Sequence, residues 1–381
     1  MAGKATGSAV SSPLRLALTG AVGFFVLGIV VSVLGPTLPE LRSRHGLDAT
    51  GGATLLAAFS VGSAAGVALS GFIRHRYPAP RLLSIGALCL AVGCAGVPFA
   101  PNGPLVACCL LFAGLGFGMF DVLLNLVVAT AYGRGSGAVL SATSAAFGAS
   151  AVLTPLLVGR APRNLALPYL VCAVTATALL VLTTTLRTPN TSPLTSRRAT
   201  RRELRVIVLL GSVLLGYVAF EGGVSSWETT YLRGVSSMSA AGAANAVALF
   251  WLGLTVGRLV STPLALHWHP ARLVLTSLAL ATCSVLVATN TAYAVAAFAV
   301  TGLLLAPVFP AVITWQARVV PSGRGATRVF AAGLAGPIVG APILGLATDA
   351  SSAAAVPWVL AAFGVAATSV AFLSYRLAQP G

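Results

Sequence analysis

The sequence is poor in charge, and the shortage is greatest for acidic side chains. Only 8% of its 381 residues are charged, seven of them are Asp or Glu, and Lys4 is the one lysine. Soluble domains carry about 25% charged residues, so this composition excludes an ordinary soluble protein. With 57% hydrophobic residues and a mean hydropathy of +0.94, the chain is expected to be an all-α integral membrane protein.

Other absences narrow the function. The phosphate-binding pattern G-x-x-x-x-G-K-[ST] is missing, so ATP-driven transport is unsupported. The six cysteines have no His or carboxylate at metal-ligand spacing, and all four histidines fall in predicted connections. The net charge of +16 comes from arginines in short gaps between apolar runs, whereas a nucleic-acid surface needs a contiguous basic face. We therefore expect no metal, no cofactor and no nucleic-acid partner.

Twelve apolar segments are long enough to cross a bilayer, which takes about 20 helical residues. They cover residues 16–38, 52–73, 82–100, 105–132, 138–158, 165–186, 206–227, 241–266, 273–289, 293–315, 326–347 and 353–375. The first run is too long for the apolar part of a signal peptide and lacks a small-residue cleavage site. It is therefore expected to stay as the first span.

One long polar stretch, 188–205, separates the sixth span from the seventh. It holds two prolines and five arginines, a composition typical of a flexible linker. The predicted domains are an N-terminal tail (1–15), a six-helix bundle (16–187), the linker (188–205), a second six-helix bundle (206–376) and a C-terminal tail (377–381).

Basic residues are unevenly shared between the two sides of the predicted membrane protein. With a cytoplasmic N-terminus, 17 of the 23 basic residues lie on the cytoplasmic side and 5 on the other, with Arg258 inside a span. Cytoplasmic loops collect Lys and Arg, so both termini are expected in the cytoplasm. The expected location is the plasma membrane, as a multi-pass protein of the bacterial inner membrane.

The two halves also repeat one pattern. Five residues recur 191 positions later in the chain: Gly62, Gly66, Ser70, Arg81 and Leu82 correspond to Gly253, Gly257, Ser261, Arg272 and Leu273. Parallel six-span repeats joined by a linker are typical of major facilitator transporters.

The chain resembles the major facilitator superfamily over essentially its whole length. Residues 71–76 with Arg81 are similar to the superfamily's loop between the second and third spans, except that His75 replaces the usual Asp and Pro78 the usual Gly. The resemblance implies twelve helices in two pseudo-symmetric bundles that work by alternating access. A gating or structural role is predicted for four arginines in this loop and its repeat, namely Arg74, Arg76, Arg81 and Arg272.

Within the superfamily, the chain looks most like the fucose–proton symporter group. The likeness lies in residues 118–125 (GMFDVLLN), 217–227 (YVAFEGGVSSW), 250–258 (FWLGLTVGR) and 306–310 (APVFP). The fourth span has an acid and lacks the arginine typical of drug–proton antiporters, which favours import. The resemblance implies that the substrate is a sugar or a similar polar small molecule.

Two acidic residues lie deep in apolar spans. By helical rise, Asp121 is ~24 Å from residue 105 and Glu221 is ~22 Å from residue 206. A central Asp costs roughly 2.5 to 3.5 kcal/mol to insert, so such residues usually line an aqueous path or relay protons. We predict that both bind protons or substrate, with Asn125 as the polar partner of Asp121 one turn away. A structural hydrogen bond between helices is the alternative.

A polar stripe follows helical spacing along the seventh span. Tyr217, Glu221, Ser225 and Glu228 share one face, which is expected to line the central cavity with Glu228 at its outer mouth. Trp227 is predicted either to stack on a sugar ring or to anchor the helix at the membrane interface.

Four more residues are candidates of lower specificity. Asn245, Trp251 and Gln316 could line the cavity or its exits. Arg258 is near the end of its span and is expected to act in gating or structure on the cytoplasmic side, with substrate contact as the alternative. Asp349 is predicted to be a loop residue.

The sequence therefore predicts a proton-coupled secondary transporter, not an enzyme, that acts as a monomer on a small molecule. An efflux pump for drugs or metabolites is the alternative, with a cavity lined by Phe120, Phe220, Phe250 and Trp251. A membrane-embedded enzyme or sensor is more remote, because no nucleophile–base pair lies in the spans.

Overall fold

The computed structural model describes residues 12–132, 136–186, 200–319 and 323–378, and within these ranges the chain is helical with no strand. The first bundle contains α1 (Pro13–His45), α2 (Ala49–Ile73), α3 (Ala79–Gly96), η1 (Val97–Phe99), α4 (Gly103–Tyr132), α5 (Ser136–Arg160) and α6 (Ala166–Thr184). The second contains α7 (Arg201–Gly234), α8 (Ala240–His267), α9 (Pro270–Val287), α10 (Ala294–Leu305), α11 (Val308–Val319), α12 (Gly323–Ala350), η3 (Ala353–Ala355) and α13 (Val356–Ala378).

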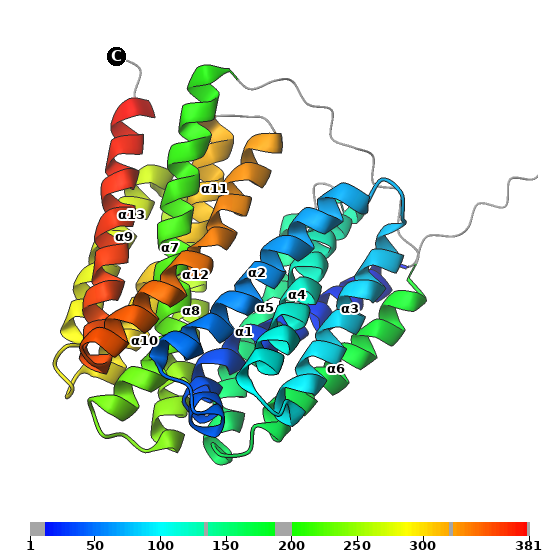
Figure 1. The fold of residues 1–381 in the computed structure, drawn as a ribbon. Helices are drawn as coiled ribbons and strands as arrows, with labels where there is room; N and C mark the ends of the chain where they lie inside the picture. Colours follow the sequence, from blue (N-terminus) through cyan, green and yellow to red (C-terminus); the bar gives the residue numbers. More distant parts are fainter. Residues whose placement is uncertain (1–11, 133–135, 187–199, 320–322, 379–381) are drawn as a thin grey trace, which may run out of the picture.

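The predicted two-bundle architecture is confirmed. Helices α1–α6 pack mainly with one another, as do α7–α13, and Figure 1 shows them as two groups side by side. Within the described ranges, eleven helical stretches are long and apolar enough to cross a membrane. The predicted span 293–315 consists of α10 and α11, which break at Ala306 and Pro307. Pro307 has no backbone N–H, so it cannot continue the helical hydrogen-bond ladder.

Two helices extend beyond their predicted ends. Helix α1 continues through Pro36 and Pro39 and stops at Gly46, whose left-handed φ of 62° suits glycine. Helix α7 already begins at Arg201, because Thr200 and Glu203 form a capping box that satisfies its first amide groups. Residues 201–205, predicted to be linker, therefore belong to α7.

The repeat found in the sequence has a physical cause. Added Cβ atoms on Gly62 and Gly66 of α2 would collide with backbone carbonyls of α4, and those on Gly253 and Gly257 of α8 with carbonyls of α10. Both bundles thus contain a helix pair held at backbone contact by two glycines one turn apart. The shared pattern records the same close packing in each bundle.

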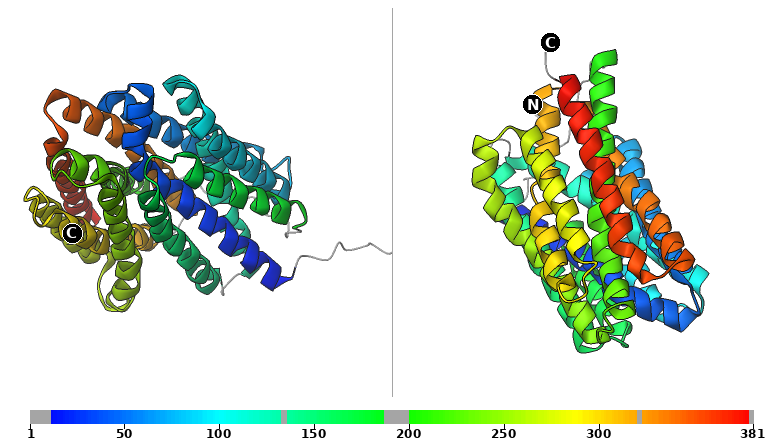
Figure 2. Two further views of the ribbon diagram at one scale, coloured as in Figure 1. Left: turned by 90° about the horizontal axis from the view of Figure 1, so that it is seen from below. Right: turned by 90° about the vertical axis from the view of Figure 1, so that its left-hand side faces the viewer.

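The bundles contact each other toward one end of the molecule, along α2–α12, α5–α8 and α1–α7. This contact end is the one where the chain passes from α1 to α2, from α5 to α6 and from α7 to α8. There Gly345 of α12 lies against Ala53 of α2, and Gly35 of α1 lies against the Ser225 carbonyl of α7. Figure 1 shows the bundles diverging toward the opposite, terminal end, where α1 begins and α13 ends, and Figure 2 (right) shows α7 beginning and α13 ending at that end.

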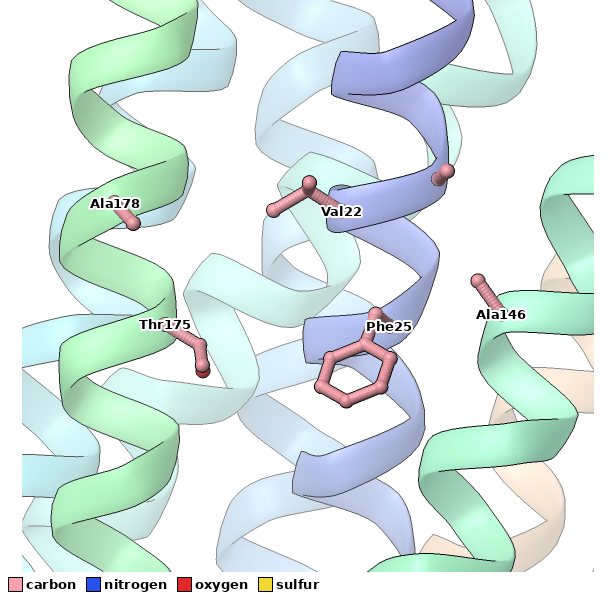
Figure 3. Close-up of a pocket in the computed structure, with 6 residues that line it drawn as sticks. Val22, Phe25, Ala146, Thr175 and Ala178 are labelled. Carbon is pink, nitrogen blue, oxygen red and sulfur yellow. The ribbon is translucent and has the colours of Figure 1, made fainter.

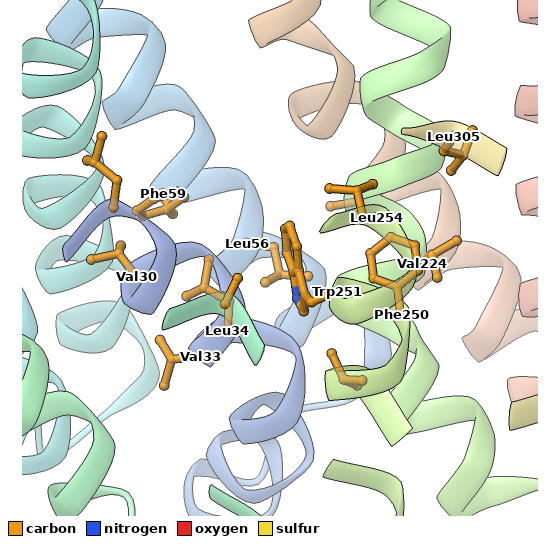
Figure 4. Close-up of a cluster of buried hydrophobic side chains, with 14 of the residues drawn as sticks. Val30, Val33, Leu34, Leu56, Phe59, Val224, Phe250, Trp251, Leu254 and Leu305 are labelled. Carbon is orange, nitrogen blue, oxygen red and sulfur yellow. The ribbon is translucent and has the colours of Figure 1, made fainter. Parts of the chain in front are cut away.

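An apolar cluster crosses from one bundle to the other above the contact end. Figure 4 shows the ring of Trp251 from α8 lying between Leu34 and Leu56 of the first bundle and Val224 of the second. The Trp251 ring also packs edge-on against Phe147 of α5, with centroids 5.9 Å apart. Because these side chains are buried, the cluster fills the space between the two bundles next to the contact end.

Candidate functional site

The acidic residue of the first bundle is held by its own helix. Asn125 Nδ2 donates to Asp121 Oδ1 at 3.0 Å and to the Asp121 backbone carbonyl at 2.9 Å. Phe120 and Leu124 of α4 face Gly23 of α1, and Asp121 follows on the neighbouring face. It is half-buried. The structure brings together the pair that the sequence predicts.

The acidic residue of the second bundle belongs to a larger cluster. The Tyr217 hydroxyl lies close to the Glu221 carboxyl group, one turn away on α7, and the guanidinium of Arg258 on α8 is close enough to act on both. Glu221 and Arg258 are half-buried, whereas Tyr217 is 1% exposed. A carboxylate, a phenol and a guanidinium therefore meet between α7 and α8.

The rest of the predicted α7 stripe lies deeper than expected. Glu228 is 0% exposed, so its predicted place at a cavity mouth is wrong, because α7 continues for six residues beyond it to Gly234. Trp227 is also fully buried, which excludes an interfacial anchor. Ser225 is buried and donates to the Gly222 carbonyl at 3.3 Å.

The remaining cavity candidates lie in different places. Trp251 is 3% exposed at the bundle interface, and its Nε1 has no hydrogen-bond partner in the described part of the chain. Asn245 is exposed at the start of α8, beside Gly159 of α5. Gln316 is buried in α11. The structure does not bring these three into one site.

The predicted gating arginines lie at the terminal end. Arg74 forms the C-cap of α2, and its N–H donates to Ser70 at 3.1 Å. Arg76, Arg81 and Arg272 are exposed. Partial burial, and then the charges of Arg318 and Arg272, lower the pKa of the nearby His269. Basic groups therefore gather at this end.

A cavity of about 390 Å³ lies away from both acidic residues, between α1, α5 and α6 (Figure 3). It is lined by Ala21, Val22, Phe25, Ala146, Thr175 and Ala178. The Thr175 hydroxyl donates to backbone carbonyls of its own helix at 2.9 Å. The cavity therefore offers no charged group to a polar solute.

One functional contact was missed by sequence reasoning. Asp349, at the end of α12, accepts hydrogen bonds from the backbone N–H groups of Ala49 at 2.9 Å and Thr50 at 2.7 Å. It is therefore a helical residue that caps α2 across the bundle interface, and the predicted loop position is wrong. The partners are 300 and 299 residues apart in the chain, so no local pattern could have revealed the contact.

The sequence profile of the Major Facilitator Superfamily matches residues 20–287. The chain belongs to this superfamily. Among curated members, it is 30% identical over 142 residues to the cyanate transport protein CynX of Escherichia coli strain K12, a match covering 36% of each chain. It is 23% identical over 362 residues to the sodium-dependent glucose transporter 1 of Danio rerio, covering 82% of this chain and 60% of that protein. The matches to curated relatives span 25% to 63% of their lengths.

Solved structures of the Major Facilitator Superfamily share the fold over nearly the full length. The D-xylose–proton symporter has a TM-score of 0.78 at 14% identity, with 96% of this chain and 98% of that chain covered. The fucose–proton symporter FucP of Escherichia coli has a TM-score of 0.65 at 14% identity, covering 97% and 99%. The expected likeness to the fucose–proton symporter group is confirmed at the level of fold. Membership implies a multi-pass membrane transporter of a small molecule.

Proposed function

We propose that this protein is a proton-coupled secondary transporter that moves a sugar or similar polar small molecule into the cell by alternating access. The observation that carries the proposal is the pair of half-buried acidic residues, Asp121 and Glu221, one in each bundle and both within apolar spans. Membrane proteins keep such residues where they meet water, protons or solute.

The chemistry around these residues suits a hydroxylated solute. Asp121 and Glu221 can accept hydrogen bonds from hydroxyl groups, and Asn125 and Arg258 can donate to them. One elementary charge falling through 100 mV supplies about 2.3 kcal/mol, enough for modest accumulation of a neutral molecule. The names of similar proteins, among them a D-xylose–proton symporter and a glucose transporter, point to the same substrate class.

The efflux alternative needs a cavity lined by aromatic side chains. Phe120, Phe220 and Phe250 are each 0% exposed and Trp251 is 3% exposed. Phe120 packs against Gly23 of α1 and Phe220 against Gly364 of α13. Phe120 and Phe220 are thus part of the bundle cores, and Trp251 is buried at the bundle interface. None of the four rings is exposed to a cavity, which favours import of a polar solute.

Uptake into proteoliposomes under an imposed pH gradient tests the proposal. Labelled sugars are screened against other polar solutes and against lipophilic amines, which an efflux pump would accept. We expect gradient-driven accumulation of a sugar, its loss in Asp121→Asn and Glu221→Gln, and retention in the control Glu40→Gln, an acid at the contact end. Normal accumulation in both site variants would refute the coupling assignment, and selective transport of amines would refute the substrate class.

A further inference from the structure

Four consecutive residues of α7 carry buried polar atoms without hydrogen-bond partners among the described residues. They are Nε1 of Trp227, both carboxyl oxygens of Glu228, and the hydroxyls of Thr229 and Thr230. Exposure is 0% for the first two residues, 1% for Thr229 and 8% for Thr230. Most buried polar side-chain atoms in proteins have a partner, so this run needs an explanation beyond packing.

Glu228 is two turns from Glu221 on the same face of α7, about 10 Å along the helix. Just before it, the Ser225 carbonyl packs against Gly35 of α1 so closely that a Cβ atom on the glycine would collide with it. This α1–α7 packing belongs to the contact end. Glu228 lies three residues beyond this contact and is fully buried in this conformation.

The charged groups around α7 do not compensate Glu228. Glu40 and Arg42 on α1 and Asp349 on α12 lie toward the contact end, and Arg258 on α8 lies beside Glu221. None of them is a hydrogen-bond partner of Glu228, whose two carboxyl oxygens have no partner among the described residues. On α7 itself, Tyr231 donates to the Ala288 carbonyl at 2.6 Å and is committed to that bond.

Without a partner in the described part of the chain, Glu228 is expected to be neutral in this conformation. An ionised carboxylate buried without a counter-charge or hydrogen bonds costs several kcal/mol. The neutral acid avoids most of that cost. Glu228 therefore holds a proton while the contact end is closed.

We propose that Glu228 is a proton-binding residue that exchanges its proton at the contact end only when the two bundles separate there. On opening, a hydronium ion transfers its proton to a Glu228 oxygen and becomes water, and closure encloses the neutral acid. The inference deepens the proposed function and rests on its proton coupling, but the protonation of Glu228 can be measured without knowing the solute.

Infrared spectroscopy of the reconstituted protein measures the protonation state of Glu228 directly. We expect the wild type to show a C=O absorption of neutral carboxyl groups that is partly lost in Glu228→Gln and fully kept in Glu40→Gln. The lost component should persist in the wild type as the bulk pH is raised from acidic to neutral, because the group is enclosed. If Glu228→Gln leaves the absorption unchanged, Glu228 is ionised and the inference is wrong.

A second measurement is made on proteins that keep Glu228, so it does not depend on whether the Glu228→Gln variant folds. Dicyclohexylcarbodiimide adds to a neutral carboxyl group to give an N-acylurea, with no group lost, and mass spectrometry locates the adduct. We expect labelling at Glu228 to rise at least about fivefold, roughly 1 kcal/mol of opening, in Asp349→Ala, which removes the cap at the contact end. No label in either protein would overturn the inference.

The two proposals fail separately. A wild type that accumulates no solute under a pH gradient refutes the proposed transport, whatever the spectra show. A wild type that accumulates solute, combined with unchanged accumulation and unchanged absorption in Glu228→Gln, refutes the role of Glu228 and leaves the transport proposal intact.

Discussion

The two bundles hold their mid-span acids in different ways. In the first bundle, Asp121 has an amide partner on its own helix, Asn125. In the second, Glu221 has a phenol partner, Tyr217, and the nearby charge of Arg258 from the next helix. The fold is pseudo-symmetric, but these two sites are not.

Because of this difference, we expect neutralisation of the Asp121 carboxylate and of the Glu221 carboxylate to have different effects. Among the described residues no cation acts on Asp121, so a proton can balance its negative charge. Glu221 already has the charge of Arg258 close by. Neutralising Glu221 therefore leaves a cation behind, whereas neutralising Asp121 does not.

The largest expected effect is the loss of stability in Glu221→Gln compared with Asp121→Asn. Glu221→Gln leaves Arg258 without the nearby carboxylate, and interacting charged residues couple by about 0.5 to 3 kcal/mol, so a loss of about 1.5 kcal/mol is expected. Asp121→Asn should cost less than about 1 kcal/mol, because an amide can still hydrogen-bond Asn125. Unfolding in mild detergent, followed by thermal or denaturant titration, measures both. Equal losses would show that Arg258 does not compensate Glu221.

A double-mutant cycle measures whether Arg258 interacts with Glu221 and not with Asp121. Glu221→Gln and Arg258→Gln together should be about 1.5 kcal/mol more stable than the sum of the single changes, because interacting charged residues couple by about 0.5 to 3 kcal/mol. The matched cycle of Asp121→Asn with Arg258→Gln should be additive within about 0.5 kcal/mol. Coupling in this control cycle would mean that both acids share the arginine.

The hydrogen-bond partners are expected to matter about equally in the two bundles. Asn125→Ala removes the Nδ2 donor from Asp121, and Tyr217→Phe removes the hydroxyl donor from Glu221. Each should cost about 1 kcal/mol of stability and weaken solute binding without abolishing gradient-driven accumulation. Unfolding midpoints and uptake at varied solute concentration measure these effects, and complete loss of accumulation would make the partners part of the coupling itself.

The smallest effect on transport is expected at a third acid, outside both sites. Asp349→Ala should cost about 1 kcal/mol, the usual value of a helix cap, and proton coupling should remain. Asp349→Asn keeps an acceptor oxygen and serves as the matched control, with little change expected. The ratio of protons to solute, measured with a pH-sensitive dye inside proteoliposomes, separates this acid from the other two. A changed ratio would give Asp349 a part in coupling.

Most of the fold could be predicted because a bilayer demands long apolar runs, and these are visible in composition alone. The division into two bundles followed from the polar stretch after the sixth span and from glycines such as Gly62 and Gly253. The helix ends were less accurate. The start of α7 was missed although Thr200 and Glu203 carry the sequence signal of a capping box. The end of α1 was missed because the predicted span covers only the apolar run, whereas the helix continues past residue 38 to His45.

The site was predictable only where its partners share a helix. Asp121 with Asn125, and Tyr217 with Glu221, are one turn apart, so helical periodicity reveals them. The association of Arg258 with Glu221 depends on how α8 packs against α7, and no local pattern encodes that. The burial of Glu228 was not predicted, because the predicted span ends at residue 227 whereas α7 continues to Gly234.

The Asp349 cap has a consequence for how easily the bundles part. Its carboxylate binds the amide groups of Ala49 and Thr50, which the first turn of any helix leaves without partners. When α12 withdraws, water can take over both hydrogen bonds, so opening exchanges one set of bonds for another at little enthalpic cost. These two hydrogen bonds therefore favour the closed conformation without preventing the bundles from separating. Side chains with a single acceptor oxygen should therefore be tolerated at position 349. Such variants should change the rate of the transport cycle, while the direction of transport stays the same.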